Sequence, residues 1–212
     1  MEQKTDFKAL STKAKLQYIW DYYSLPFIII GGIIIVVALV IYQFFTYEPP
    51  MFNVIMFNCN HPVDTTAVGY YDFLEEEGIE HTDADVSLTS TLNFTEDSAT
   101  TIYDRQTLTT LLYAGGQDIL MGTGEVYMAY VEQNVLMNLL DVLSPDTMQK
   151  YEDDLIYSTD TETGETYPCA IELKDNSWLK KYDYYDNCYF GIPYGAGNLE
   201  LATQFAEYLL AQ

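Results

Sequence analysis

The sequence predicts an α/β protein with an N-terminal transmembrane helix, followed by a single extracytoplasmic layered domain with a mostly parallel sheet. Residues 22–47 form one long apolar run without a charge, between Asp21 and Glu48. Beyond this run, short apolar segments of strand length alternate with longer segments of helical periodicity. Strands that alternate with helices favour a parallel sheet, because a helix is the usual connection between parallel strands.

The apolar run at residues 22–47 is long enough for a transmembrane helix. About 20 apolar residues in a helix cross the hydrocarbon core of a bilayer. Tyr and Phe residues lie at both ends of the run, where aromatic rings meet the lipid headgroups. A cleaved signal peptide would have a shorter apolar region followed by a small-x-small cleavage site, whereas the bulky residues 42–47 follow here. The uninterrupted Ile and Val residues at 33–37 are unusual for the core helix of a soluble protein, so we expect an uncleaved anchor.

Basic residues predict the orientation of this anchor. The lysines that precede the apolar run are Lys4, Lys8, Lys13 and Lys15. The next Lys or Arg is Arg105, and basic residues close to a transmembrane helix stay in the cytoplasm. We therefore expect residues 1–21 to be a basic cytoplasmic tail, residues 22–47 to cross the cell membrane once, and residues 48–212 to be extracellular. The lipid bilayer is thus the first expected partner.

The expected extracellular domain is strongly acidic. The chain holds 32 acidic and nine basic residues, of which three and four lie in residues 1–47. Residues 48–212 therefore keep 29 acidic and five basic residues, a net charge of −24. Such a charge repels nucleic acid and anionic surfaces, so nucleic-acid binding is not expected. The many aromatic and aliphatic residues, 20 Tyr among them, exclude a disordered acidic tail.

The acidic domain begins with FNVIMF at residues 52–57, a continuous apolar run typical of a strand buried on both faces. Glycines are expected to end two helices, at Gly78 and at Gly115-Gly116. A further helix opens at Gly122-Thr123-Gly124, and residues 162–165 are expected to form a hairpin turn. The expected strands are residues 52–57, 84–89, 118–121, 167–173 and 189–192, and the expected helices are residues 68–77, 98–113, 124–136 and 199–210.

Four short phrases follow these elements in order: Ala114–Leu120 (AGGQDIL), Asn138–Leu143 (NLLDVL), Tyr167–Leu173 (YPCAIEL) and Tyr189–Pro193 (YFGIP). Their order resembles that in the first lobe of bacterial extracellular solute-binding proteins, the type II periplasmic-binding-protein fold. The opening sequence Lys15–Pro26 is similar to that of small single-pass membrane proteins of Gram-positive bacteria. The resemblance implies a domain that binds a solute, although a complete member of the family has two lobes and only one is expected here.

A ligand site is expected where the strands end, because ligands of open α/β sheets bind beyond the carboxyl ends of the strands. Flexible glycines, a hydroxyl and free N–H groups at a helix start suit a carboxylate, a phosphate or a sugar hydroxyl. Alternatively, Thr123 caps the helix with Glu125 nearby and binds nothing. The candidate ligand-binding residues are Asn58, Asn60, His61, Thr123, Gly124 and Glu125.

No catalytic or metal site is expected from the sequence. His61 and Asp64 lack a third ligand at a suitable spacing, so a solvated turn is the expected structure there. Phosphate-binding loops, nucleophile elbows and zinc-protease motifs do not occur in the chain. We therefore expect a non-catalytic protein without a cofactor.

Two features leave alternatives open. The aromatic run at residues 182–190 either stacks sugars or fills the edge of the core. Cys169 and Cys188 either form a disulfide beside a free Cys59, or all three cysteines are small buried hydrophobic residues.

The leading functional expectation is a membrane-anchored extracytoplasmic domain that binds a small solute or a membrane-protein partner. The alternative is a structural or accessory subunit of an envelope or transporter complex. A concave polar pocket at the strand ends favours ligand binding, whereas an exposed apolar patch favours a protein partner.

Overall fold

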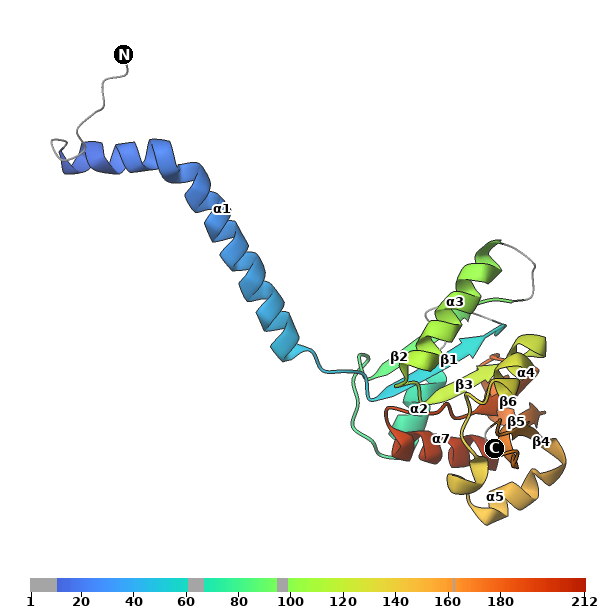
Figure 1. The fold of residues 1–212 in the computed structure, drawn as a ribbon. Helices are drawn as coiled ribbons and strands as arrows, with labels where there is room; N and C mark the ends of the chain where they lie inside the picture. Colours follow the sequence, from blue (N-terminus) through green and yellow to red (C-terminus); the bar gives the residue numbers. More distant parts are fainter. Residues whose placement is uncertain (1–10, 61–66, 95–98, 162) are drawn as a thin grey trace. The chain divides into compact units, whose positions relative to one another are not determined.

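The computed structural model describes residues 11–60, 67–94, 99–161 and 163–212 (Figure 1). The chain divides into two units, Met1–Pro49 and Pro50–Gln212. The first unit contains one long helix, and the second contains a six-stranded sheet with its helices. The protein is therefore a mixed α/β chain with one apolar N-terminal helix.

The long helix of the first unit is α1 (Thr12–Thr46), and Ser11 caps it by accepting a backbone hydrogen bond at 3.4 Å. Figure 1 shows α1 bending in its first half, where Pro26 lies inside the helix and cannot donate a backbone hydrogen bond. The segment Ile28–Thr46 has the length and apolar composition of a membrane-crossing helix, which fits a membrane anchor or a signal sequence. The expected boundary between residues 21 and 22 lies inside this continuous helix.

The strands of the second unit are β1 (Phe52–Phe57), β2 (Val86–Leu92), β3 (Ile119–Gly122), β4 (Leu155–Thr159), β5 (Thr166–Lys174) and β6 (Asn187–Gly191). They form one sheet in the order β2-β1-β3-β6-β5-β4. Strands β2 and β3 run parallel to β1, whereas β6 is antiparallel to β3, and β5 is antiparallel to both β6 and β4. The expectation of a mostly parallel sheet is therefore wrong, because three of the five strand pairs are antiparallel.

The antiparallel half of the sheet includes a hairpin. A parallel pair needs a crossover of about a dozen residues or more, whereas an antiparallel pair can be joined by a tight turn. Strands β4 and β5 are joined in this second way, and the backbone N–H of Asp160 donates to the carbonyl of Glu165 at 2.8 Å. The hairpin turn expected at residues 162–165 is thus confirmed for its described residues 163–165. Strand β4, which follows three acidic residues, is absent from the strands that the sequence predicts.

The described helices of the second unit are α2 (Val68–Glu76), α3 (Ala99–Ala114), α4 (Gly124–Glu132), α5 (Pro145–Lys150), α6 (Ser177–Lys181) and α7 (Leu199–Ala211), with 3-10 turns η2 (Leu139–Asp141) and η3 (Glu152–Asp154). Glycines follow α2 and α3 as predicted, and Gly78 and Gly115 have φ of 68° and 76°. The helix expected over residues 124–136 is shorter, since the chain turns at Asn134 with φ 55°.

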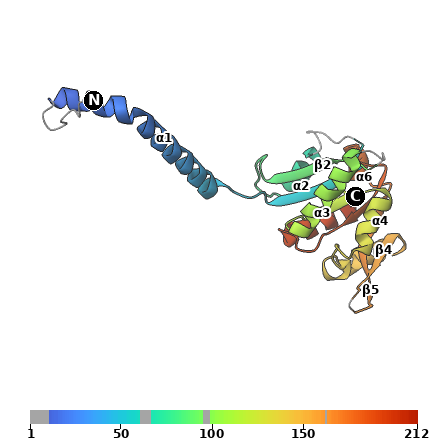
Figure 2. The ribbon, with the colours of Figure 1, turned by 45° about the horizontal axis from the view of Figure 1, so that its top comes forward.

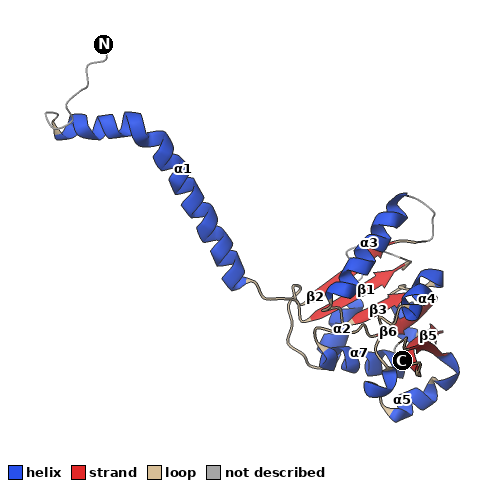
Figure 3. Ribbon diagram, in the orientation of Figure 1, coloured by secondary structure: helices blue, strands red, loops and turns tan. Residues whose placement is uncertain are grey.

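The two faces of the sheet belong to two hydrophobic clusters. Phe52, Val54 and Met56 of β1 join the first cluster, together with side chains from α2, α6 and α7. Ile55 and Phe57 join the second cluster, together with side chains from α3 and α4. Figures 2 and 3 show helices on both sides of the sheet. Burial on both faces is the physical reason that β1 is a continuous apolar run.

A buried carboxylate joins β1, β3 and α7. Asp118, directly before β3, is fully buried and accepts backbone hydrogen bonds from Asn53 at 2.7 Å and from Asn198 at 2.6 Å. Asn198 in turn caps α7 by accepting from the backbone N–H of Leu201. Burial raises the pKa of the Asp118 carboxyl, and the backbone hydrogen bonds oppose this rise. Asp118 thereby fixes the start of β3 against β1 and the start of α7.

All three cysteines are free thiols. Cys169 belongs to the second hydrophobic cluster and Cys188 to the first, so their side chains lie on opposite faces of the sheet. The disulfide alternative is therefore wrong, and Cys169 and Cys188 are small buried side chains. Burial raises the pKa of Cys59 to about 11 and that of Cys169 to about 12, and it raises the pKa of Cys188 further still. These thiols stay protonated at neutral pH.

Candidate functional site

The structure brings the carboxyl ends of β1 and β3 together, because these strands are parallel neighbours. Asn58 follows β1, and its Nδ2 donates to the backbone carbonyl of Thr123 at 3.3 Å. Asn58 Oδ1 accepts from the backbone N–H of Phe94 at 2.6 Å. The Asn58 backbone has φ 55°, a left-handed conformation that Asn adopts more readily than most residues. Both polar ends of the Asn58 side chain therefore join loops of the protein.

Asn60, another residue predicted after β1, does not extend this group. Asn60 is exposed, and its side-chain Nδ2 donates to Asp183 Oδ1 at 3.2 Å. Its backbone N–H donates to the carbonyl of Tyr184 at 2.9 Å. Asn60 thus ties the end of β1 to the segment before β6. His61 and Asp64 lie outside the described residues.

Thr123, Gly124 and Glu125 form the start of α4. Thr123 occupies the N-cap position, but its hydroxyl accepts no capping hydrogen bond from the helix. The alternative in which the Thr123 side chain caps α4 is therefore wrong, and the first N–H groups of the helix lack this partner. Gly124 has φ 78°, which glycine adopts without strain. Glu125 is exposed in the first turn, where a negative charge is favourable beside the helix dipole.

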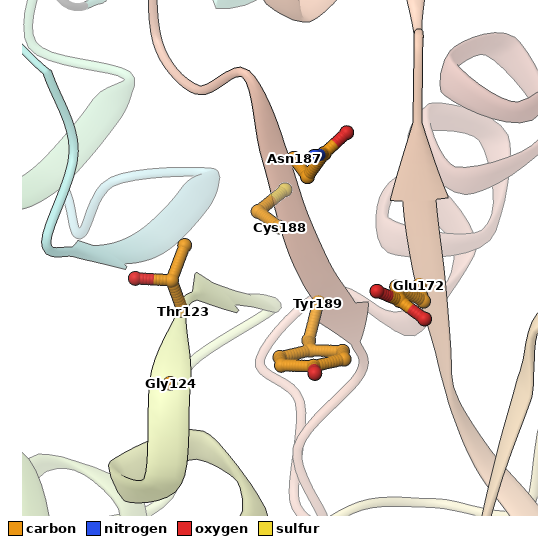
Figure 4. Close-up of a pocket in the computed structure, with 6 residues that line it drawn as sticks. All are labelled: Thr123, Gly124, Glu172, Asn187, Cys188 and Tyr189. Carbon is orange, nitrogen blue, oxygen red and sulfur yellow. The ribbon is translucent and has the colours of Figure 1, made fainter.

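A pocket of about 170 Å³ lies between the start of α4 and the strands β5 and β6, and we call it the first pocket (Figure 4). Tyr189 of β6 pairs with Gly122 of β3 on one side and with Glu172 of β5 on the other. The lining residues are Thr123, Gly124, Glu172, Asn187, Cys188 and Tyr189. Thr123 and Gly124 are thus the predicted site residues that line this pocket. Asn58, Asn60 and Glu125 are not part of the lining.

Sequence reasoning missed Glu172, Asn187 and Tyr189 as site residues. Tyr189 lies within the aromatic run that the sequence singles out, but nothing local assigns it to a pocket. These residues reach the site because β6 lies antiparallel beside β3, an arrangement that the parallel-sheet prediction excludes. If the antiparallel pairing of β6 with β3 had been predicted, Tyr189 would have been expected next to Thr123, because Tyr189 pairs with Gly122.

The first pocket has a carboxylate on one side and a helix start on the other. The Glu172 side chain is 32% exposed and lies 3.1 Å from Lys174 Nζ, which also contacts Asp154 at 2.7 Å. The N-terminus of α4 carries the partial positive charge of the helix dipole. The lining itself contains no Lys, Arg or His side chain. The pocket therefore lies between a helix N-terminus and a carboxylate that is paired with Lys174.

The lining supplies hydrogen bonds and charge rather than a reactive nucleophile. Cys188 is 2% exposed, and burial raises the pKa of its thiol well above the usual range. Within the part of the chain that the structure describes, no cluster of three His, Cys, Asp or Glu side chains could hold a metal ion. The arrangement is suited to binding a small polar molecule.

Most of the aromatic run at residues 182–190 belongs to the core. Tyr184 and Tyr185 are each 2% exposed, and the ring centroids of Tyr184 and Trp178 lie 5.0 Å apart. These contacts support the core alternative for the run rather than sugar stacking. Tyr189 is half-buried and keeps one side at the first pocket.

Comparison with family models, curated proteins and solved structures finds no match to this chain.

Proposed function

We propose that this protein is a single-pass membrane protein whose extracytoplasmic domain binds a small zwitterionic solute without converting it. The observation that carries the proposal is the first pocket, where the start of α4 and the Glu172 carboxylate line a space of about 170 Å³. The resemblance of four short phrases to one lobe of solute-binding proteins is consistent with the same role.

The membrane anchor in this proposal is α1. Its segment Ile28–Thr46 has 19 residues and rises about 28 Å, close to the thickness of the hydrocarbon core. The lysines of residues 1–21, and the lack of Lys and Arg from residue 16 to residue 104, favour a cytoplasmic N-terminus. The domain after Pro50 then lies outside the cell.

The charges around the first pocket favour a zwitterion. The N–H groups at the start of α4 attract a carboxylate. Glu172 would bind the ammonium group of the ligand beside Lys174 Nζ, which lies 3.1 Å from its carboxylate. A purely anionic ligand is disfavoured by Glu172 and by the net charge of −24 on residues 48–212. Asn187 and Tyr189 add side-chain hydrogen bonds beside these charges. An unmodified amino acid has this pair of charges within a small volume.

Thermal unfolding of the full chain in lipid nanodiscs tests the proposal. The panel contains glycine, alanine and glutamine as zwitterions, with acetate, phosphate and ethylammonium as probes of a single charge sign. At a hundredfold excess over its dissociation constant, a bound zwitterion stabilises the native state by about 2.7 kcal/mol. For a domain of this size, that free energy raises the unfolding midpoint by roughly 5–10 °C.

Two variants locate the binding. Glu172→Gln removes the charge that attracts the ammonium group and is expected to abolish the rise in midpoint. Glu152→Gln, an exposed residue of η3 outside the pocket lining, is the matched control and is expected to keep the rise. A flat panel with a cooperative unfolding transition, or an equal rise with acetate alone, would contradict the proposal.

A second candidate function, an accessory subunit of an envelope or transporter complex, is favoured by α3. Ile102 and Tyr113 of this helix are 62% and 66% exposed. They lie about three helical turns apart and therefore on the same face. These two exposed side chains are the contact points that we propose for a protein partner. A photo-crosslinking residue at Tyr113 should then capture one membrane-protein partner that the same residue at Tyr157 of β4 does not, and equal capture would count against this role.

A further inference from the structure

A second pocket, of about 220 Å³, lies at the other end of α4. Thr123 precedes the first turn of α4 and Asn134 follows its last turn, so the length of this helix, about 14 Å, separates the two pockets. The lining comes from four segments: the end of α4, the turn between β4 and β5, the start of β5, and the loop after β6. The lining residues are Asn134, Asp160, Thr161, Tyr167 and Tyr194.

Asn134 is held in one orientation at this second pocket. Its backbone has φ 55°, and its backbone N–H donates to the carbonyl of Val131 at 3.1 Å. Its Oδ1 accepts hydrogen bonds from Ser158 Oγ at 2.7 Å and from the Tyr167 hydroxyl at 3.2 Å. The acceptor end of the amide is therefore used by the protein, and the Nδ2 end is the one that can donate to a ligand.

Two tyrosines form another part of the lining. The pKa of Tyr167 is raised to about 12, mainly by burial and to a smaller extent by a hydrogen bond with Tyr194. The phenol therefore stays neutral and keeps its proton. The backbone N–H of Tyr194 donates to the carbonyl of Val135 at 2.9 Å, which fixes this loop against the chain after α4. The Tyr194 side chain is 49% exposed. A half-exposed ring on a fixed backbone offers an apolar face to a ligand.

Asp160 places a carboxylate on the ordered turn between β4 and β5. Its backbone N–H donates to the carbonyl of Glu165, and its carbonyl accepts from Gly164, each at 2.8 Å. Asp160 Oδ1 also accepts from the backbone N–H of Thr163 at 2.9 Å. Asp160 therefore contributes the carboxylate of the lining.

We propose that the second pocket binds a neutral saccharide. Vicinal sugar hydroxyls both donate and accept hydrogen bonds. The lining offers them an acceptor, the Asp160 carboxylate, and a donor, the Asn134 Nδ2 group. The Thr161 hydroxyl can do either, and the Tyr167 hydroxyl, which donates its proton to Asn134 Oδ1, can accept. The C–H face of a sugar ring would lie against the half-exposed ring of Tyr194.

Other ligand classes match this lining less well. Anions are repelled by Asp160 and by the acidic domain, and the lining holds no Lys, Arg or His. Calcium takes about six to eight oxygen ligands, and Asp160 is the single carboxylate among the lining residues. A simple amine would satisfy Asp160 but would leave the Asn134 amide and the Thr161 hydroxyl unmatched.

Saturation-transfer difference NMR on the full chain in lipid nanodiscs tests this inference. The probes are methyl α-D-glucopyranoside, N-acetyl-D-glucosamine and maltotriose, with acetate and ethylammonium as controls. We expect saturation transfer to ring C–H protons of at least one saccharide and none to the controls. Tyr194→Ala is expected to weaken saccharide binding about tenfold, because the stacking ring is lost. Tyr157→Ala removes a ring that is 51% exposed on β4, outside the lining, and should leave binding unchanged.

Further variants separate the second pocket from the first. Asp160→Asn keeps an oxygen for the Thr163 N–H and is expected to weaken binding while the unfolding midpoint is maintained. Glu172→Gln is expected to bind saccharide normally, and its failure to bind would place the saccharide in the first pocket and overturn the inference. So would equal binding by wild type and a folded Tyr194→Ala, or no transfer to any saccharide from a chain whose circular dichroism shows the native fold.

Discussion

Replacement of Gly122 by alanine is expected to destabilise the second unit by about 3 kcal/mol, through a steric clash inside the core. Gly122 ends β3, directly before the pocket residues Thr123 and Gly124. A Cβ atom at this position would lie 2.3 to 2.5 Å from carbons of the Phe57 ring. Ordinary carbon–carbon contacts are about 3.5–4.0 Å, so the ring would have to move by about 1 Å.

The environment of Phe57 sets the magnitude. The ring is fully buried, with centroid distances of 5.3 Å to Phe94 and 6.0 Å to Tyr127. Overpacking a core typically costs about 1–3 kcal/mol, and neighbours on two sides of the ring favour the upper end. Gly78→Ala is the control, because Gly78 has φ 68° and open space around its Cβ position. The free energy of unfolding of that variant should fall by only about 1–2 kcal/mol, because alanine is strained at this left-handed φ but meets no steric clash.

Urea denaturation of the full chain in a Trp20→Phe background measures these differences, because fluorescence then reports Trp178, which is 2% exposed in the core. Adding Phe57→Leu to Gly122→Ala should relieve the clash, so the double variant loses less stability than the sum of the two single variants, by about 1–2 kcal/mol. A Gly122→Ala chain within about 0.5 kcal/mol of wild type, or strictly additive losses, would refute the steric argument.

Three further predictions concern single groups. Asp118→Asn should cost about 1–3 kcal/mol in urea denaturation, since one buried backbone N–H loses its acceptor, and an unchanged midpoint would count against this. The Tyr182 hydroxyl, and then Lys181, lower the pKa of Asp72, so its contribution is present above the ordinary carboxyl pKa and is lost as pH falls through the lowered value. The stability difference between wild type and Asp72→Asn, below about 1 kcal/mol at this partly exposed site, should therefore shrink as pH falls below the ordinary carboxyl pKa of about 4. Cys169 and Cys188 should resist iodoacetamide at pH 8 in the native chain and react in urea, as mass spectrometry would show; fast native labelling would contradict their burial.

Elements that depend on local pattern were predictable from the sequence. The helix α7 lies at the predicted residues 199–210 and buries Ala202, Phe205, Ala206, Leu209 and Leu210, which recur at helical spacing in the sequence. Strand β1 occupies the predicted residues 52–57, since burial on both faces requires a continuous apolar run. The glycines after α2 and α3 likewise end these helices for reasons that lie within a few residues.

Strand direction and half of the first pocket were not predictable, because they depend on contacts between distant segments. The local sequence of residues 187–191 does not indicate that this strand lies antiparallel between β3 and β5. Thr123 and Gly124 could be found at the end of a strand, whereas Glu172 and Asn187 become site residues only through that insertion. Asn58 shows the converse case, since its polarity suggested a ligand but its amide is used by Phe94 and Thr123.

The place of β1 in the sheet has a mechanical consequence. β1 is the first strand after α1, and it lies between β2 and β3 with hydrogen bonds to both. Tension in the chain reaches β1 through residues 47–51, where Pro49 and Pro50 have fixed φ angles and little slack. A pull along β1 acts across two ladders of hydrogen bonds at once, so the strand must shear from both neighbours together instead of unzipping bond by bond. The chain thus attaches its helix at a point of the domain that resists force.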